Sequence, residues 1–286
     1  MHEYGESNSS CPVCGWTESD MQKQQEKFPD ALQLGMALGK RYLVGRVLRQ
    51  DAFSILYVGW DELLYDKVCI EEFYPKDLVC RTYSKSGWGK TVSGCQIRLL
   101  TDEGASIFEN GLKAFVLESA DLHKIQRLPE IIQIYRVIHE NNTAYRIMEF
   151  LEDQSLQEEL ARDITRNISA DERFLRILDD VLSSLHMRGL GHLNLRPSNI
   201  FLIGSDIRSR MIKLTQFGMA RAELHKLLGA SSSLYQEEED RNFIAPQILK
   251  GEDCSSEIAD DYSYCMIKKL FPGFSMNSRG MKDNES

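Results

Sequence analysis

The sequence predicts an α+β protein of two lobes, the first rich in β-strands and the second rich in helices. Between residues 41 and 150, short apolar runs of strand length alternate with polar turns, and one longer segment has helical spacing. Beyond residue 151, the apolar side chains recur mostly at helical spacing. A chain of 286 residues is long enough for one large domain or two small ones.

The charge and composition exclude several classes of protein. The chain has 34 Lys and Arg against 43 Asp and Glu, and this net charge of −9 argues against nonspecific binding to nucleic acid or to an anionic membrane. No apolar stretch approaches the length of a membrane span, about 20 residues, and the polar, acidic N-terminus is unlike a signal peptide. Seven scattered cysteines indicate reduced thiols. We therefore expect a cytoplasmic protein.

The first lobe follows a leader that comprises residues 1–40. Residues 105–125 predict its single helix, because Phe108, Leu112 and Phe115 fall on one face at helical spacing. The strands predicted for this lobe, in chain order, are residues 42–48, 53–60, 67–73, 131–138 and 143–150.

The second lobe is predicted to be mostly helical. Ser169–Glu172 form a capping box, which begins a helix that ends near Gly189. A last helical segment covers residues 255–271, roughly, and residues 273–286 are expected to be disordered. Between the two helices, the sequence predicts short strands at residues 200–203 and 211–214, then a polar stretch at residues 231–240.

Several short motifs lie in a fixed order along this plan. They are Cys11–Trp16, Arg49–Ser54, Val68–Glu71, His192–Asn199, Gln216–Gly218 and Ala245–Gln247. Together with the two-lobed plan they resemble the protein kinase family, and most of all the bacterial serine/threonine kinases with a Cys-Pro-x-Cys-Gly-Trp knuckle at the N-terminus. The resemblance implies a kinase-like bilobal domain over residues 41–272, with an N-lobe of about 41–150 and a truncated C-lobe of about 151–272.

The segment that resembles the family's glycine-rich loop has lost its glycines. Arg49, Asp51 and Ser54 stand where glycines let the backbone N–H groups of the family approach the phosphates of ATP. Asp51 adds negative charge near a triphosphate, and Arg49 either contacts phosphate or fills the space itself. The plainer alternative is an ordinary β-hairpin without a ligand.

A glutamate replaces the lysine that holds the phosphates in the family. This residue is Glu71, and its usual ion-pair partner on the first-lobe helix, Glu118, is retained. At ~4 Å and an effective dielectric constant near 20, such a contact amounts to about 4 kcal/mol, here repulsive. The carboxylates are expected to separate, share a proton or recruit a cation, and a displaced helix is the simplest outcome. Lys67 lies roughly 13 Å along the strand, too far for a simple substitution.

The catalytic loop and the metal motif are changed as well. The resemblance places His192, Asn194, Arg196 and Asn199 at the catalytic-loop positions of the family. Asn194 replaces the aspartate that accepts the substrate proton, and an amide has no useful basicity. Gln216 replaces the metal-binding aspartate, which leaves Asn199 as the one remaining family ligand for Mg²⁺.

The walls of the adenine pocket are also implied by the resemblance. They are Leu48, Leu56, Cys69, Met148 and Phe201. The residues at positions 56, 69 and 201 are bulkier than those usual in the family, so the pocket is expected to be partly filled by protein. The alternative is that all five are ordinary core residues.

These losses together predict a pseudokinase, an interaction or regulatory module that binds Mg-ATP weakly or not at all. No cofactor is expected, and the expected partner is a protein, such as an active kinase or its substrates. The alternative is an atypical but active ATP-dependent serine/threonine kinase or nucleotidyl transferase, in which Arg49, Arg196 and Asn199 hold the nucleotide in an unusual pose.

The leader contains a candidate zinc knuckle. Cys11 and Cys14 resemble half of a zinc ribbon and supply two of the four ligands that a structural zinc site needs. Either a dimer or distant residues complete the site, or both cysteines are free thiols.

The resemblance implies a short C-lobe, whose last helix is expected to be partly uncovered. The resemblance implies that Asp260 is the acid that anchors this helix. Ile258, Met266 and Leu270 form a candidate apolar patch for a protein partner or for oligomerisation. The alternative is a truncated gene product of low stability.

Overall fold

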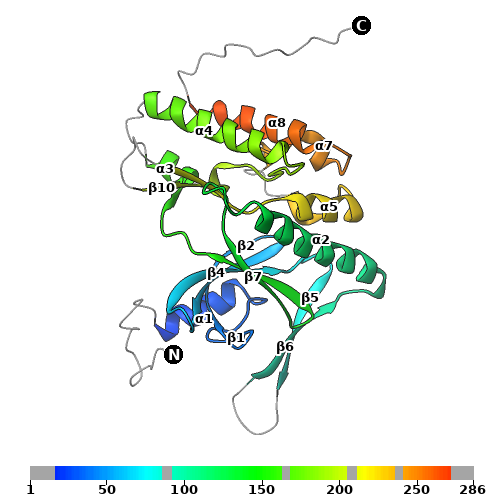
Figure 1. The fold of residues 1–286 in the computed structure, drawn as a ribbon. Helices are drawn as coiled ribbons and strands as arrows, with labels where there is room; N and C mark the ends of the chain where they lie inside the picture. The colour runs from blue at the N-terminus through cyan, green and yellow to red at the C-terminus, as the bar shows by residue number, and fades with distance from the viewer. Residues whose placement is uncertain (1–16, 86–91, 163–167, 205–210, 236–240, 272–286) are drawn as a thin grey trace.

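The computed structural model describes residues 17–85, 92–162, 168–204, 211–235 and 241–271. They form a β-rich lobe with one long helix and a helical lobe stacked against it (Figure 1). The predicted two-lobed α+β architecture is confirmed. The candidate zinc ligands Cys11 and Cys14 and the expected disordered tail lie outside the described residues.

The main sheet of the first lobe has six antiparallel strands in the order β1-β2-β3-β4-β8-β7. The strands are β1 (Ala37–Leu38), β2 (Tyr42–Gln50), β3 (Ser54–Asp61), β4 (Asp66–Phe73), β7 (Ile134–Glu140) and β8 (Thr143–Glu149). All five predicted strands are present. The fourth, β7, begins at Ile134 instead of Ile131, because Ile131 forms a parallel bridge with Leu214 of the second lobe.

The predicted first-lobe helix is present as α2 (Ala105–Lys124), which crosses one face of this sheet (Figure 1). Phe73 of β4 is the centre of the packing between them. Its ring lies 5.4 Å from the ring of Phe53, and 5.5 Å from those of Phe108 and Phe115 of α2. Aromatic pairs of this kind contribute about 0.5–1.5 kcal/mol each beyond their buried area.

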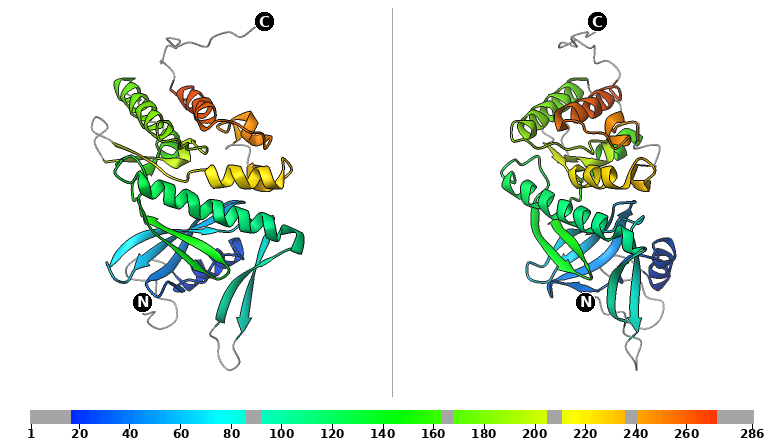
Figure 2. Two further views of the ribbon diagram at one scale, coloured as in Figure 1. Left: turned by 45° about the vertical axis from the view of Figure 1, so that its right-hand side comes forward. Right: turned by 90° about the vertical axis from the view of Figure 1, so that its right-hand side faces the viewer.

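A second sheet of two strands, which the sequence did not predict, extends from the first lobe as a long hairpin (Figure 2). Its strands are β5 (Val79–Lys85) and β6 (Val92–Leu99). Arg81 of β5 attaches it to the main sheet through an ion pair of 2.6 Å with Glu72, and both side chains are at most 1% exposed. Tyr57 and Tyr145 also donate hydrogen bonds to the Glu72 carboxylate, at 2.8 and 2.9 Å.

The described part of the leader, residues 17–40, packs onto the first lobe. It contains α1 (Glu18–Lys27), which begins at a capping box formed by Thr17 and Asp20. Leu32 and Leu38 are buried in the same core as the main sheet. The N–H of Leu32 donates a hydrogen bond of 3.0 Å to the hydroxyl of Tyr57. The packing unit of the first lobe therefore includes these residues as well as those from position 41 onward.

The second lobe combines short helices with a small sheet of the order β11-β10-β9. Its elements are β9 (Gln154–Ser155), α3 (Leu156–Ala161), α4 (Ile168–His186), β10 (Ile200–Ile203), β11 (Met211–Leu214), α5 (Met219–Leu228), α7 (Pro246–Leu249) and α8 (Ser256–Lys268). Both predicted strands and the last two predicted helical segments are present. Helix α5 was not predicted, and it lies directly beside α2 of the first lobe (Figures 1 and 2).

Helix α8 is fastened to the loop after α4 by Asp260. The Asp260 carboxylate accepts hydrogen bonds of 2.7 Å from the backbone N–H groups of His192 and Leu193. In the candidate apolar patch, Ile258 is 57% exposed, whereas Met266 and Leu270 are half-buried. Leu270 packs against the second-lobe core, so the exposed part of this patch is small.

Two further observations bear on location and redox state. Over the described residues, no helix is both long and apolar enough to cross a membrane. The five cysteines in those ranges, at positions 69, 80, 95, 254 and 265, are all free thiols.

Candidate functional site

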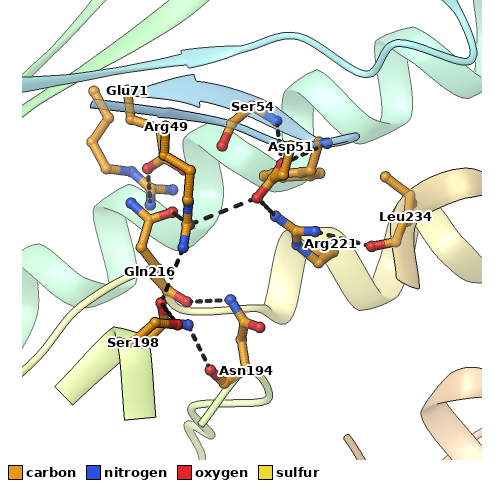
Figure 3. A network of polar contacts seen from close by, with 12 residues as sticks. Arg49, Asp51, Ser54, Glu71, Asn194, Ser198, Gln216, Arg221 and Leu234 are labelled. Carbon is orange, nitrogen blue, oxygen red and sulfur yellow. Dashed lines mark hydrogen bonds and ion pairs between the residues drawn. The ribbon is translucent and has the colours of Figure 1, made fainter. Parts of the chain in front are cut away.

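The candidate site lies where the two lobes meet, and a network of polar contacts crosses it (Figure 3). The first lobe contributes the turn between β2 and β3 together with β4 and α2. The second lobe contributes the loop after α4, the residues after β11 and the first turn of α5. The predicted site residues of the glycine-loop, catalytic-loop and metal motifs are brought together here.

Arg49, near the end of β2, extends toward the two residues that the resemblance assigns to metal binding. Its Nη2 donates a hydrogen bond of 2.7 Å to Oε1 of Gln216, and its Nη1 donates one of 3.4 Å to Oδ1 of Asn199 (Figure 3). These residues, Gln216 and Asn199, stand at the two positions that the resemblance assigns to metal binding. A guanidinium therefore lies between them and uses the oxygen atoms that a cation would need.

Asp51 fills the turn that would otherwise be a glycine-rich loop. Its Oδ1 accepts hydrogen bonds from the backbone N–H groups of Phe53 and Ser54, at 2.8 and 2.9 Å. Its Oδ2 forms an ion pair of 2.5 Å with Arg221 of α5. Burial raises the pKa of Asp51, but Arg221 and Arg49 lower it more, so the pKa lies well below the usual value and the side chain is a carboxylate. The N–H groups of this turn are already satisfied by the protein.

The two glutamates expected to repel each other share one arginine from a neighbouring strand. Arg146 of β8 lies opposite Glu71 in the sheet, with Nη1 at 3.2 Å from Oε2 of Glu71. Its Nη2 lies 2.8 Å from Oε1 of Glu118, and its Nε donates a hydrogen bond to the hydroxyl of Ser119 at 2.8 Å. Arg146 is 2% exposed. The carboxylates have recruited a cation from the chain itself.

Of the outcomes expected for this pair of glutamates, the structure shows the recruited cation. Arg146 of β8 bridges Glu71 of β4 and Glu118 of α2. The other oxygen of Glu118, Oε2, accepts a hydrogen bond of 2.8 Å from the N–H of Ala220 in α5. Burial raises the pKa of Glu118, and Arg146 and the Ala220 N–H oppose that rise.

Lys67 does not take part in this arrangement. Its Nζ forms an ion pair of 2.5 Å with Glu152, and its side chain is 50% exposed. It also lies over the ring of Phe150, with 5.6 Å between Nζ and the ring centroid. This agrees with the distance argument that excluded Lys67 as a replacement for the missing lysine.

The side chains of both asparagines in the catalytic loop are hydrogen-bonded to the backbone. The Nδ2 of Asn194 donates a hydrogen bond of 2.8 Å to the carbonyl of Gln216, and the Nδ2 of Asn199 donates one of 2.8 Å to the carbonyl of Asn194. Both residues are buried. The position of the family's base therefore holds an amide that donates to the backbone, and it has no lone pair of useful basicity to offer a substrate.

His192 and Arg196, the other catalytic-loop positions, are buried beneath this site. The ring of His192 stacks on Phe217 with 4.4 Å between the centroids. Burial lowers the pKa of His192 to about 4, although Asp260 nearby works in the opposite direction. The imidazole is therefore neutral at pH 7 and serves as a packing element.

These residues do not fit a magnesium ion. Mg²⁺ prefers anionic oxygen ligands, whereas the two family positions supply the amides of Gln216 and Asn199, both already bonded to Arg49. In the described ranges, no group of three or more His, Cys, Asp or Glu side chains could hold a metal ion. We therefore derive no reaction step through a metal.

The candidate adenine walls lie in the neighbouring hydrophobic cluster. Cys69 and Met148 face each other across β4 and β8 and are buried. Leu48 and Leu56 are half-buried and pack against the same cluster, and Phe201 of β10 is half-buried. Burial and the charge of Glu71 raise the pKa of the Cys69 thiol, so it is protonated.

Sequence reasoning missed two arginines of this site. The contact of Arg146 with Glu71 could have been found from the sequence. Each residue lies in a predicted strand, and pairing these two strands places the residues opposite each other. Arg221 had no comparable signal, since α5 was not predicted and its partner Asp51 is 170 positions away along the chain.

A two-lobed fold with these motif positions at the lobe junction is that of the protein kinases. Residues 101–284, more than half of the chain, match the family model described as "Protein kinase domain". The chain therefore belongs to the protein kinase domain family.

Individual relatives are distant. The chain is 23% identical over 189 residues to CBL-interacting serine/threonine-protein kinase 24 of Arabidopsis thaliana, a match that covers 65% of this chain and 40% of the relative. It is 25% identical over 148 residues to serine/threonine-protein kinase PDK1 of Cryptococcus neoformans, covering 51% of this chain and 12% of the relative. The chain thus spans less than half the length of these two curated relatives.

A solved structure described as "PpkA-294 apo form" is similar in fold. Its TM-score is 0.62 at 21% sequence identity, and the match covers 85% of this chain and 79% of that one. At this level of identity, the likeness supports the fold alone.

Proposed function

We propose that this chain is a catalytically impaired, kinase-like interaction or regulatory module that binds Mg-ATP weakly or not at all. The observation that carries the proposal is the guanidinium of Arg49 between Gln216 and Asn199. A divalent cation beside it would meet a like charge and two neutral amides, so the phosphates of ATP lose the ion that normally neutralises them.

Two further features support an impaired catalyst. The amide of Asn194 cannot accept the proton of a substrate hydroxyl. The lysine that binds the phosphates is replaced by Glu71, and the nearest cation, Arg146, is 2% exposed and bonded to two carboxylates. Metal, base and phosphate-binding lysine act as one unit, so no single remaining group restores the reaction.

Acting without catalysis implies acting through the surface. We propose a protein partner, such as an active kinase or its substrates, and a cytoplasmic location. The motif Cys11–Trp16 supports a relation to the bacterial kinases that carry this knuckle, with zinc as its candidate ligand.

Isothermal titration calorimetry with ATP, in the presence of Mg²⁺ and again with excess EDTA, tests the proposal on the full chain. We expect no saturable heat at micromolar concentrations in either condition. Saturable, magnesium-dependent binding in that range would contradict it.

A label-transfer assay addresses the alternative of an active phosphotransferase or nucleotidyl transferase. ATP labelled at the γ or α phosphate is incubated with the wild type, Asn199→Ala and Lys67→Ala. Lys67 is the matched control, because it lies outside the site. Transfer by the wild type and Lys67→Ala that is lost in Asn199→Ala would favour the alternative. No transfer by any of the three agrees with the proposal.

A further inference from the structure

Residues 219–235 follow β11 of the second lobe, yet three of them form polar contacts with the first lobe. We call them the strap; it contains α5 and the turn at Ser233–Tyr235. Both views of Figure 2 show α5 beside α2, at the boundary of the lobes. Contacts with the first lobe occur in the first two turns of α5 and near the end of the strap.

The strap begins against α2. Ala220 donates its N–H to Oε2 of Glu118 at 2.8 Å, so the first turn of α5 is bonded to the first-lobe helix. One turn further, the side chain of Leu224 lies against Gly111. A Cβ atom at Gly111 would be 2.8 Å from Cδ1 of Leu224, so the absence of a side chain there lets the two helices approach closely.

Beside Ala220, Arg221 forms a buried ion pair with the turn between β2 and β3. Nη2 of Arg221 lies 2.5 Å from Oδ2 of Asp51, and each side chain is 6% exposed. Nη1 of Arg221 donates a hydrogen bond of 3.0 Å to the carbonyl of Leu234 (Figure 3). The guanidinium also lies over the rings of Phe53 and Tyr235, at 5.0 and 5.9 Å. One side chain thus joins the first lobe, α5 and the far end of the strap.

The end of the strap is bonded to the first lobe a third time. The N–H and the hydroxyl of Ser233 both donate hydrogen bonds of 2.7 Å to the carboxylate of Asp77. On its other side, α5 is attached to the second lobe, because the buried ring of His225 is hydrogen-bonded to the carbonyl of Leu249.

We infer that the strap is a clamp that holds the two lobes closed on each other in the absence of nucleotide and metal. The three ties use charges and amides of the chain alone, and the turn at Asp51 that would close over a nucleotide is fixed by Arg221. This inference goes beyond the proposed function, since a closed lobe arrangement does not depend on whether ATP binds.

Hydrogen–deuterium exchange of the nucleotide-free full chain tests the clamp. In the wild type, we expect slow exchange of the amides of residues 220–235 and of the turn at residues 50–54. Arg221→Met leaves Asp51 buried without its main partner, so exchange should accelerate about tenfold or more in both segments. Lys226→Met is the matched control, because it removes an exposed ion pair from the same helix, and its exchange should stay within about twofold of the wild type.

Rapid exchange of the strap in the wild type would overturn the inference, as would an Arg221→Met effect confined to the strap. If Arg221→Met does not fold, a disulfide test replaces it. Asp77 and Ser233 touch at the surface, so Asp77→Cys with Ser233→Cys should cross-link on mild oxidation without nucleotide. Failure of that cross-link, judged by peptide mapping, would also overturn the clamp. Neither result bears on the calorimetry with Mg-ATP.

Discussion

At the scale of single residues, two arginines occupy places that kinases give to other cations. Arg49 contacts Gln216, one of the two positions that the resemblance assigns to the metal, and Arg146 pairs with Glu118 in place of the expected lysine. The cation that pairs with Glu118 lies on β8 instead of β4, and Glu71 adds a second carboxylate at the position on β4. One buried guanidinium pairs with two buried carboxylates, and the phosphate-binding lysine is lost.

Arg146→Met tests how much this buried cation contributes to stability. The variant leaves Glu71 and Glu118 buried without a cation, so we expect the free energy of unfolding to fall by about 3–5 kcal/mol. Urea denaturation followed by circular dichroism measures the change. Adding Glu71→Lys to this variant places a cation on β4 opposite Glu118, and should recover a large part of the loss.

Lys67→Met is the control for Arg146→Met, because Lys67 forms an exposed ion pair and its removal should cost no more than about 1 kcal/mol. An equal loss in the two variants would show that Arg146 contributes no more than a surface cation. A double variant no more stable than Arg146→Met would contradict the view that a cation on β4 can replace Arg146 of β8.

Arg49 also makes a testable difference to metal binding. In Gln216→Asp, the new carboxylate should pair with Arg49, so we expect no binding of Mn²⁺. The double variant Arg49→Ala with Gln216→Asp removes the competing guanidinium and leaves a carboxylate beside the amide oxygen of Asn199. Titration with Mn²⁺ followed by electron paramagnetic resonance should detect binding by the double variant and not by the wild type. Binding by the wild type, or equal binding by both variants, would refute the role given to Arg49.

At the scale of the elements, local patterns sufficed for the main sheet, α2, α4 and α8, each of which has a clear period of apolar side chains. They failed for α5, a helix of ten residues, which is shorter than an isolated helix needs to be stable in water. Its stability comes from partners distant in sequence: Glu118, Asp51 and the notch at Gly111. The hairpin β5–β6 was missed for a similar reason, since Arg81 depends on a buried partner in another strand.

A double-variant cycle tests the contact between α2 and α5. Alanine at position 111 is the better helix former by about 1 kcal/mol, yet its Cβ would lie 2.8 Å from Leu224 and 3.0 Å from Phe73. We expect the steric term to prevail, with a net loss of about 1–3 kcal/mol in Gly111→Ala. In the background of Leu224→Ala, the same substitution should be neutral or stabilising. Urea denaturation of the four proteins measures the coupling, and additive effects would show that the helices are not in close contact.

At the scale of the whole molecule, the two lobes and the motif positions could be predicted from the sequence, but the state of the site could not. The pattern indicated which groups were missing, as at Asn194 and Gln216. It did not indicate the new contacts, because Arg49 meets Gln216 only through the packing of the two lobes, and Arg146 meets Glu71 only through the sheet register. The packing of residues 17–40 on the first lobe could not be predicted for the same reason, since it depends on contacts such as the hydrogen bond between Leu32 and Tyr57.

The response of the whole molecule to pH should depend on two histidines near Asp260. Burial lowers the pKa of His192 from 6.5 to about 4, so in the folded state it stays neutral where the unfolded chain binds a proton. Its contribution to stability is fully present above pH 6.5 and is lost as the pH falls toward 4, by about 3 kcal/mol in total. The hydrogen bond to Asp260 raises the pKa of His186, so its contribution is present below pH 6.5 and is lost as the pH rises through the higher folded value.

Urea denaturation of the wild type, His192→Gln and His186→Gln between pH 4.5 and pH 8.5, roughly, separates the two effects. The advantage of the wild type over His192→Gln should shrink as the pH falls below 6.5, because only the unfolded wild type then gains a proton. The advantage over His186→Gln should instead shrink as the pH rises, because the folded imidazolium then loses the proton that holds it to Asp260. Both substitutions leave the charge of Asp260 in place, so the opposite slopes report the histidines themselves. Parallel slopes would contradict the assignment of a neutral ring to His192 and a charged one to His186.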